Sequence, residues 1–193
     1  MKALGNLTVL CLVLFCMIIF AANGASAVEQ KAKKFYSIKF GYYGEGTMTV
    51  KSDDNEAEFD TESGIAFGIA IDVPTDGWLM PGFAFDINEI KFPGDNTMAY
   101  NFVGTLKGDF RTSGRSVAIR PGIGAGAALV PEVGYVDNSI HFTFRATNEI
   151  IYFFEQGAGI LAEIGLIWDL YGNAGEHTVH GGPFFFIRGG FGF

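Results

Sequence analysis

Apolar and polar residues alternate with a period of two along most of the chain after residue 27. In one of the clearest segments, Phe67 and Ile69 share a parity while Gly68 and Ala70 occupy the other. Such alternation is the signature of a β-strand with one face in an apolar environment. It recurs in eight segments, of which the sixth is the weakest: 36–51, 64–73, 79–88, 98–111, 116–129, 140–145, 157–170 and 184–193. The sequence therefore predicts an all-β fold.

The connections between these segments differ in length. The second and fourth are tight, at 74–77 and 113–115, whereas the first, third, fifth and seventh are mostly long and polar. This pattern is typical of an antiparallel up-and-down barrel with short turns at one end and four loops at the other. The sixth connection, 147–154, reads equally as a turn, a strand extension or part of a loop. Pro81 and Pro121 are expected to mark bulges, with a lateral opening of the wall as a further alternative.

The bulk of the apolar parity indicates which face points outward. Phe, Ile, Leu, Tyr and Trp from all eight segments exceed what the narrow interior of an eight-stranded barrel holds. The opposite parity is rich in Gly and Ala and carries nearly balanced charges, which a membrane barrel pairs inside its lumen. We therefore predict an eight-stranded transmembrane β-barrel, with a secreted soluble β protein as the alternative. The predicted lumen charge network is Lys39, Glu45, Asp72, Asp86, Lys107, Asp109, Arg111, Arg120, Arg145, Glu163, Asp169 and Arg188.

The N-terminal segment has the features of a secretory signal peptide. A charge at Lys2 is followed by an apolar run from Leu7 to Ala22 and by the small residues Ala25-Ser26-Ala27. These are the n-region, h-region and cleavage site of an export signal, and an uncleaved membrane anchor is the alternative. The predicted organisation is a cleaved signal over 1–27 and an outer-membrane β-barrel over 28–193.

Cysteine and charge restrict the chemistry further. Cys11 and Cys16 both lie in the predicted signal, so the exported chain forms no disulfide. The net charge of −8 argues against nucleic-acid binding. Three widely spaced His residues give no metal motif. No cofactor and no metal are expected.

The C-terminal segment resembles the small Gram-negative outer-membrane barrels of the opacity-protein, OmpX and OmpW-like group. Those chains end in an amphipathic strand with a terminal aromatic, a pattern matched by the predicted assembly signal Phe185, Ile187, Phe191 and Phe193. The stretch Arg120 to Gly126 and the pair Gly181-Gly182 are also similar to the group, whereas Gly189 departs from it at one apolar position. The resemblance implies a location in the cell outer membrane and recognition by the barrel-assembly machinery.

The expected function is a non-catalytic structural or surface-interaction role in the envelope. One alternative is a narrow pore for small or apolar solutes, as in the OmpW-like proteins. A second alternative is a lipid A-modifying enzyme, for which His141 and Thr143 would replace the His and Ser that such deacylases use; this match has the wrong hydroxyl residue and both side chains on the lumen parity. The expected partners are outer-membrane lipid, lipopolysaccharide and an extracellular molecule at the loops, with the protein itself a monomer.

The first connection, 52–63, is strongly acidic. It is expected to be a solvated loop. The alternatives are a site for divalent cations that bridge lipopolysaccharide, or a surface for a basic partner.

Overall fold

The computed structural model describes residues 34–193 apart from 53–54, 93, 113–115, 133–137, 155–157 and 175–176. The predicted signal peptide, with Cys11 and Cys16, lies outside the described residues. Over the described ranges, no helix has the length and apolar character needed to cross a membrane.

The described part of the chain forms eleven strands, consistent with its period-two sequence. They are β1 (Phe35–Tyr43), β2 (Gly46–Ser52), β3 (Asn55–Thr61), β4 (Gly64–Asp72), β5 (Leu79–Phe92), β6 (Asp95–Gly108), β7 (Phe110–Arg111), β8 (Val117–Val130), β9 (Ser139–Phe153), β10 (Gly159–Ala174) and β11 (His177–Gly192).

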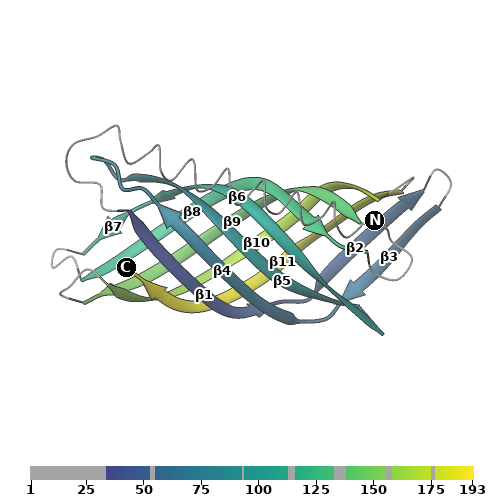
Figure 1. The fold of residues 1–193 in the computed structure, drawn as a ribbon, viewed down its shortest axis with the longest axis horizontal. Helices are drawn as coiled ribbons and strands as arrows, with labels where there is room; N and C mark the ends of the chain where they lie inside the picture. The colour runs from purple at the N-terminus through teal and green to yellow at the C-terminus, as the bar shows by residue number, and fades with distance from the viewer. Residues whose placement is uncertain are drawn as a thin grey trace, which may run out of the picture. The chain divides into compact units, whose positions relative to one another are not determined.

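Eight of these strands close into a barrel (Figure 1). The neighbours run in the order β1, β4, β5, β6, β8, β9, β10 and β11, and antiparallel pairing of β1 with β11 joins the two ends. Closure gives every wall strand a hydrogen-bonded neighbour on both sides, as a sheet in lipid requires. The predicted eight-stranded antiparallel up-and-down barrel is confirmed.

The two ends of the barrel differ. Phe193 and Tyr36 exchange backbone hydrogen bonds at the end that we call the terminal end. The strands β2 and β3 form a hairpin at the opposite end, which we call the hairpin end (Figure 1). The barrel strands from β5 to β11, other than the short β7, run for 14 to 16 residues. A tilted strand needs only about 9–11 residues to cross a bilayer, so these strands continue beyond the membrane.

The first predicted strand is interrupted, which changes the side that its second half faces. Gly44 and Glu45 lie outside the strands β1 and β2, although Gly44 N still donates to Phe185 O of β11 at 2.6 Å. Tyr36 and Phe40 point outward as expected, but Met48 is 4% exposed and faces the interior instead of sharing their side. Strict alternation through 36–51 is therefore wrong beyond Tyr43, because the irregular pair shifts the parity.

Several predicted loops are strands. Residues 55–61 of the predicted acidic loop form β3. The ambiguous connection 147–154 extends β9 as far as Phe153. Gly181 and Gly182 lie within β11 and not before it. These polar residues form strands because each segment continues a ladder with its neighbouring strand.

The outer surface of the barrel is apolar on every strand. Large apolar side chains there are typically 40–60% exposed, as at Phe40, Ile123, Phe142 and Ile187. At the terminal end, aromatic rings cluster in outward-facing pairs, including Tyr36 with Phe193 and Trp78 with Phe110. An apolar band edged by aromatic residues is the surface of a transmembrane barrel. It is the reverse of the surface that the soluble alternative requires.

Candidate functional site: the barrel lumen and the hairpin end

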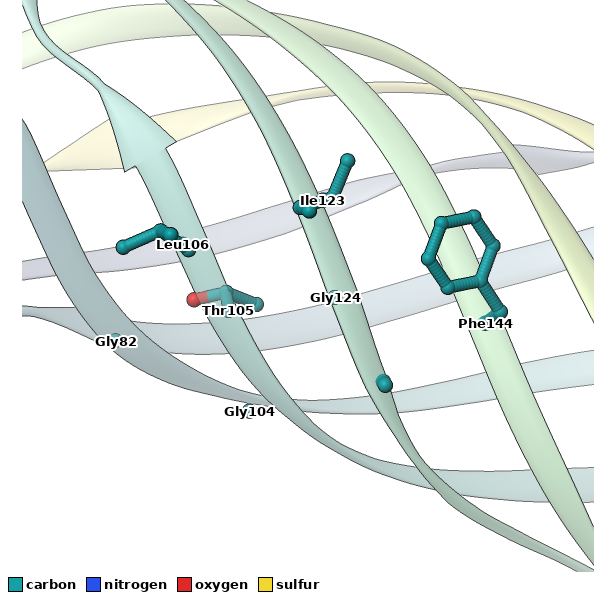
Figure 2. Close-up of a pocket in the computed structure, with 8 residues that line it drawn as sticks. Gly82, Gly104, Thr105, Leu106, Ile123, Gly124 and Phe144 are labelled. Atoms are coloured by element: carbon teal, nitrogen blue, oxygen red, sulfur yellow. The ribbon is translucent and has the colours of Figure 1, made fainter.

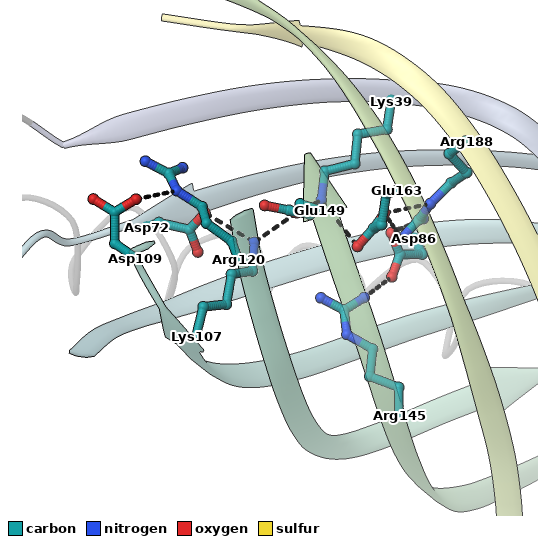
Figure 3. Close-up of polar contacts among 10 residues, drawn as sticks. All are labelled: Lys39, Asp72, Asp86, Lys107, Asp109, Arg120, Arg145, Glu149, Glu163 and Arg188. Carbon is teal, nitrogen blue, oxygen red and sulfur yellow. Dashed lines mark hydrogen bonds and ion pairs between the residues drawn. The ribbon is translucent and has the colours of Figure 1, made fainter. Parts of the chain in front are cut away.

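Charged side chains fill the middle of the barrel. Eight of them alternate in sign along a continuous series of ion pairs that we call the lumen ionic chain (Figure 3). In order, its members are Asp72, Lys107, Glu149, Lys39, Glu163, Arg188, Asp86 and Arg145. Four cations and four anions balance, and each side chain is at most 2% exposed.

The contacts within the lumen ionic chain cross the barrel. The Lys107 ammonium donates to Asp72 Oδ2 at 2.9 Å and to Glu149 Oε1 at 2.8 Å. Lys39 also donates to Glu149 and lies 3.2 Å from Glu163 Oε1. Arg188 Nε donates to Glu163 Oε2 at 2.9 Å. Arg188 and Glu163 lie opposite each other on the neighbouring strands β11 and β10. The contacts of Lys107 and Lys39 join strands that are not neighbours in the wall, so the chain braces the barrel from within.

A second group of side chains closes the terminal end of the lumen. Arg120 is fully buried, its Nε donates to Asp109 Oδ1 at 2.8 Å, and its guanidinium lies over the rings of Phe35 and Phe153. Arg111 also lies over the Phe153 ring, 4.8 Å from its centroid. Arg stacks well on aromatic faces, so this layer combines charge with apolar packing.

An apolar cluster fills the lumen towards the hairpin end. Its members come from β1, β2, β4, β5, β6, β8, β10 and β11. The rings of Tyr43 and Phe184 stack with centroids 5.1 Å apart. The buried members are Tyr43, Met48, Ala66, Ile90, Ala99, Val130, Ile167, Val179, Phe184 and Phe186. The lumen thus has an ionic middle between two layers that contain aromatic rings.

The structure places most of the predicted lumen charges inside, and Glu45 and Arg111 are the two exceptions. Glu45 is exposed in the irregular segment between β1 and β2, where strict alternation ends, so its assignment to the lumen is wrong. Arg111 is on the expected parity but stands at the rim, 37% exposed. Asp169 is buried next to Thr143, yet it is not part of the ionic chain.

Glu149 is the central residue that the sequence prediction missed. It receives both lysines of the lumen ionic chain and is fully buried. Extending the parity of His141, Thr143 and Arg145 would have reached it. The polar Asn148 on the outward parity interrupts the alternation, so the sequence did not predict that the strand continues beyond residue 145.

The side chains considered for lipid A chemistry lie inside the barrel. His141 and Thr143 are both buried in the lumen. The hydroxyl partner of His141 is Ser139, whose Oγ lies 2.6 Å from His141 Nε2. Both members of this pair are buried on the lumen side, away from the apolar outer surface where a lipid acyl ester would lie.

A hollow of about 340 Å³ opens on the outer wall across β5, β6, β8 and β9 (Figure 2). Gly104 leaves much of this space free, because a Cβ there would meet nothing closer than Ala125 O at 3.8 Å. Pro81 pairs with Leu106 and Pro121 with Asn148 in unbroken register, so the predicted bulges are wrong. The hollow is therefore a shallow depression between side chains on the outer surface, and the backbone hydrogen bonding of the wall beneath it is unbroken.

The hairpin of β2 and β3 presents a different kind of charge. Glu56, Glu58 and Asp60 are exposed and share one face of β3, because each second residue of a strand points to the same side. Lys51 on β2 is the one cation paired with them among the residues that the structure describes, 3.1 Å from Glu56 and about half exposed. This face is strongly acidic, unlike the balanced lumen.

Metal ligands do not cluster in the part of the chain that the structure describes: no group of three or more His, Cys, Asp or Glu residues could hold an ion there.

No protein-family model and no curated protein matches the sequence. Among solved structures, the fold is similar to that of Neisserial surface protein A, at 14% identity and a TM-score of 0.55, covering 84% of this chain and 98% of that one. The attachment invasion locus protein Ail of Yersinia pestis also aligns, at 15% identity and a TM-score of 0.43, covering 83% of this chain and 99% of that one. With its closed wall, apolar outer face and charged lumen, the chain has the fold of the small eight-stranded outer-membrane β-barrels.

Proposed function

We propose that the protein is a non-catalytic, non-conducting barrel of the outer membrane, and that it acts by presenting the hairpin of β2 and β3 at the cell surface. The observation that carries this proposal is the filled lumen. The neutral lumen ionic chain lies between the Arg120 layer and the apolar cluster. A lumen filled in this way makes the barrel rigid and leaves no path for solutes. Contacts with other molecules are therefore made by the hairpin and the loops beyond the membrane.

Export through a cleaved signal over 1–27 is part of the same proposal. Cleavage would remove both cysteines, and the lumen ion pairs with the closed ladder would then stabilise a barrel without disulfides. Cell fractionation tests the location. The protein should sediment with the outer membrane and change its gel mobility on boiling, and a soluble protein without a mobility shift would contradict the proposal.

Planar-bilayer recording separates this function from the narrow-pore alternative. The purified protein should give no steady unitary current, whereas reproducible single-channel steps would favour the pore.

Surface contact is tested with cells that carry a shortened hairpin, in which a tight turn replaces residues 47–60. The shortened protein should still insert and shift on heating, but cells should lose binding to host-cell or matrix surfaces that the wild type contacts. Equal binding by the two strains would contradict the proposed surface role.

A further inference from the structure

One edge of the hairpin is open. Along one side β3 pairs with β2 over its whole length, from Asn55 to Thr61. Along its other side, the described residues provide only the bridge between Glu62 and Lys91, just beyond the end of β3. An unpaired strand edge is a template for a further strand, because its outward N–H and C=O groups have no ladder partner.

The hairpin is held in place at its base. The Thr61 hydroxyl accepts a hydrogen bond from Gly46 N and donates one to Gly46 O, both at 3.0 Å. From Met48 to Lys51, β2 pairs with β11, and Met48 packs into the apolar cluster. A strand fixed in an extended conformation before binding loses little further entropy when a partner adds to it.

The two faces of β3 define what a neighbouring strand would meet. Glu56, Glu58 and Asp60 stand on one face. Ala57 and Phe59 stand on the other, opposite Val50 and Met48, and Phe59 is 42% exposed. An added strand would therefore find carboxylates on one side and apolar groups on the other, in alternation.

The acidic row decides against a second copy of the chain as the occupant. If two β3 edges paired, carboxylates would stand next to carboxylates on the same face, and like charges on neighbouring strands are destabilising. Lys or Arg in the same positions would instead form cross-strand pairs. Charge on an edge strand also blocks non-specific pairing, so the edge accepts only a complementary sequence.

We propose that the free edge of β3 binds an extended basic segment of another protein by strand addition, with Lys or Arg alternating with apolar residues. The basic side chains lie beside Glu56, Glu58 and Asp60, and the apolar ones cover Ala57 and Phe59. This inference rests on the proposed surface function and names the partner for it. Backbone pairing supplies the geometry, and the alternating side chains supply the specificity.

Binding of labelled peptides to the full barrel tests the proposal. The protein is placed in phosphatidylcholine nanodiscs, which carry no net charge, and fluorescence anisotropy is measured with two peptides of equal length and composition. In one peptide lysine and valine alternate, and in the other they form two blocks. The alternating peptide should bind about tenfold more tightly, a difference of about 1.4 kcal/mol. Equal affinities would show charge attraction alone and would overturn the proposal.

Methylation of the peptide amides tests backbone pairing without altering the protein. In an extended peptide, alternate N–H groups point to opposite edges. Methylating one alternate set should abolish binding, whereas methylating the other set should leave it nearly unchanged. If neither set matters, strand addition is excluded.

A matched pair of triple variants locates the site. Glu56→Gln, Glu58→Gln and Asp60→Asn together should weaken binding of the alternating peptide at least about tenfold. The control set Glu45→Gln, Asp76→Asn and Glu132→Gln removes the same charge from exposed positions outside β3 and should leave the affinity within about twofold. Equal losses in the two sets would overturn the assignment to β3.

The outcome is separable from that of the proposed function. If shortening the hairpin abolishes surface binding while the alternating peptide fails to bind, the surface role stands and strand addition is wrong. If the peptide binds as expected but the shortened strain still contacts every surface, the edge is real and the surface role is wrong.

Discussion

The lumen and the hairpin carry the same kinds of charged residue in opposite arrangements. Inside the barrel, eight charges alternate in sign and every member is buried against at least one partner. On the hairpin, Glu56, Glu58 and Asp60 share one sign and are exposed. The lumen ionic chain is neutral and its members are paired, whereas the hairpin face has an excess of negative charge.

The difference follows from solvation. A buried charge without a partner has a large desolvation penalty, which the alternating ion pairs of the lumen ionic chain offset. An exposed carboxylate keeps its water and needs no partner for folding. Charge in the lumen therefore serves stability, while charge of one sign on the hairpin remains available for another molecule.

Glu149→Gln should have the largest effect. It removes one anion from between Lys39 and Lys107, and the lumen keeps an excess buried cation. The free energy of unfolding should fall by about 3–5 kcal/mol, measured by urea unfolding in lipid vesicles with tryptophan fluorescence.

Two controls accompany Glu149→Gln. Adding Lys39→Met restores charge balance and should recover part of the loss, because Lys107 keeps Asp72 and Glu163 keeps Arg188. Glu58→Gln on the hairpin should change stability by less than about 0.5 kcal/mol. If Glu149→Gln were as mild as Glu58→Gln, the lumen ionic chain would not stabilise the barrel.

Met48→Ala should have the next largest effect. Its side chain joins the hairpin to the apolar cluster, so truncation leaves a cavity at the hairpin base and should cost about 2 kcal/mol. Proteolysis within β3 should become faster while the barrel keeps its heat-dependent gel shift. Unchanged proteolysis would show that the hairpin is not held by this contact.

Gly82→Ala should have a smaller effect on stability. Together with Gly104→Ala, it compares the lumen side of the wall with the outer side. A Cβ at Gly82 would lie 2.7 Å from Ile71 O on the crowded lumen side, so alanine should cost about 1–2 kcal/mol. Gly104→Ala faces the open outer hollow and should be neutral within about 0.5 kcal/mol. The same urea unfolding assay checks both variants, and equal losses would contradict the packed-lumen interpretation.

Lys51→Met should have the smallest effect on stability. Its ion pair with Glu56 is about half exposed, so stability should change by less than about 0.5 kcal/mol. The substitution also makes the hairpin more acidic. Affinity for the alternating lysine peptide should therefore rise about twofold at low salt and return towards the wild-type value at high salt, as measured by anisotropy.

Parity in the sequence predicted the barrel and most of its lumen, but it failed in the irregular segment between β1 and β2. Lys39, Asp86 and Arg188 were assigned to the interior from alternation alone, and the structure joins them through shared carboxylates. Glu45 was misplaced because it lies in the irregular segment between β1 and β2, where strict alternation ends. Glu149 was missed because the polar Asn148 interrupts the outward apolar pattern. Alternation within one segment also does not show which strands lie beside it in the barrel.

The sequence by itself determined the period of two, the number of wall strands and the face that meets lipid, since these depend on side-chain order along single strands. Only the tertiary structure decided which charges meet, where the ladder shifts and which edge stays open. Ion pairs such as Lys39 with Glu149 join residues 110 positions apart, and the free edge of β3 depends on which strand lies beside it. Such properties depend on barrel closure and register, which bring distant strands together and are not encoded in any one segment.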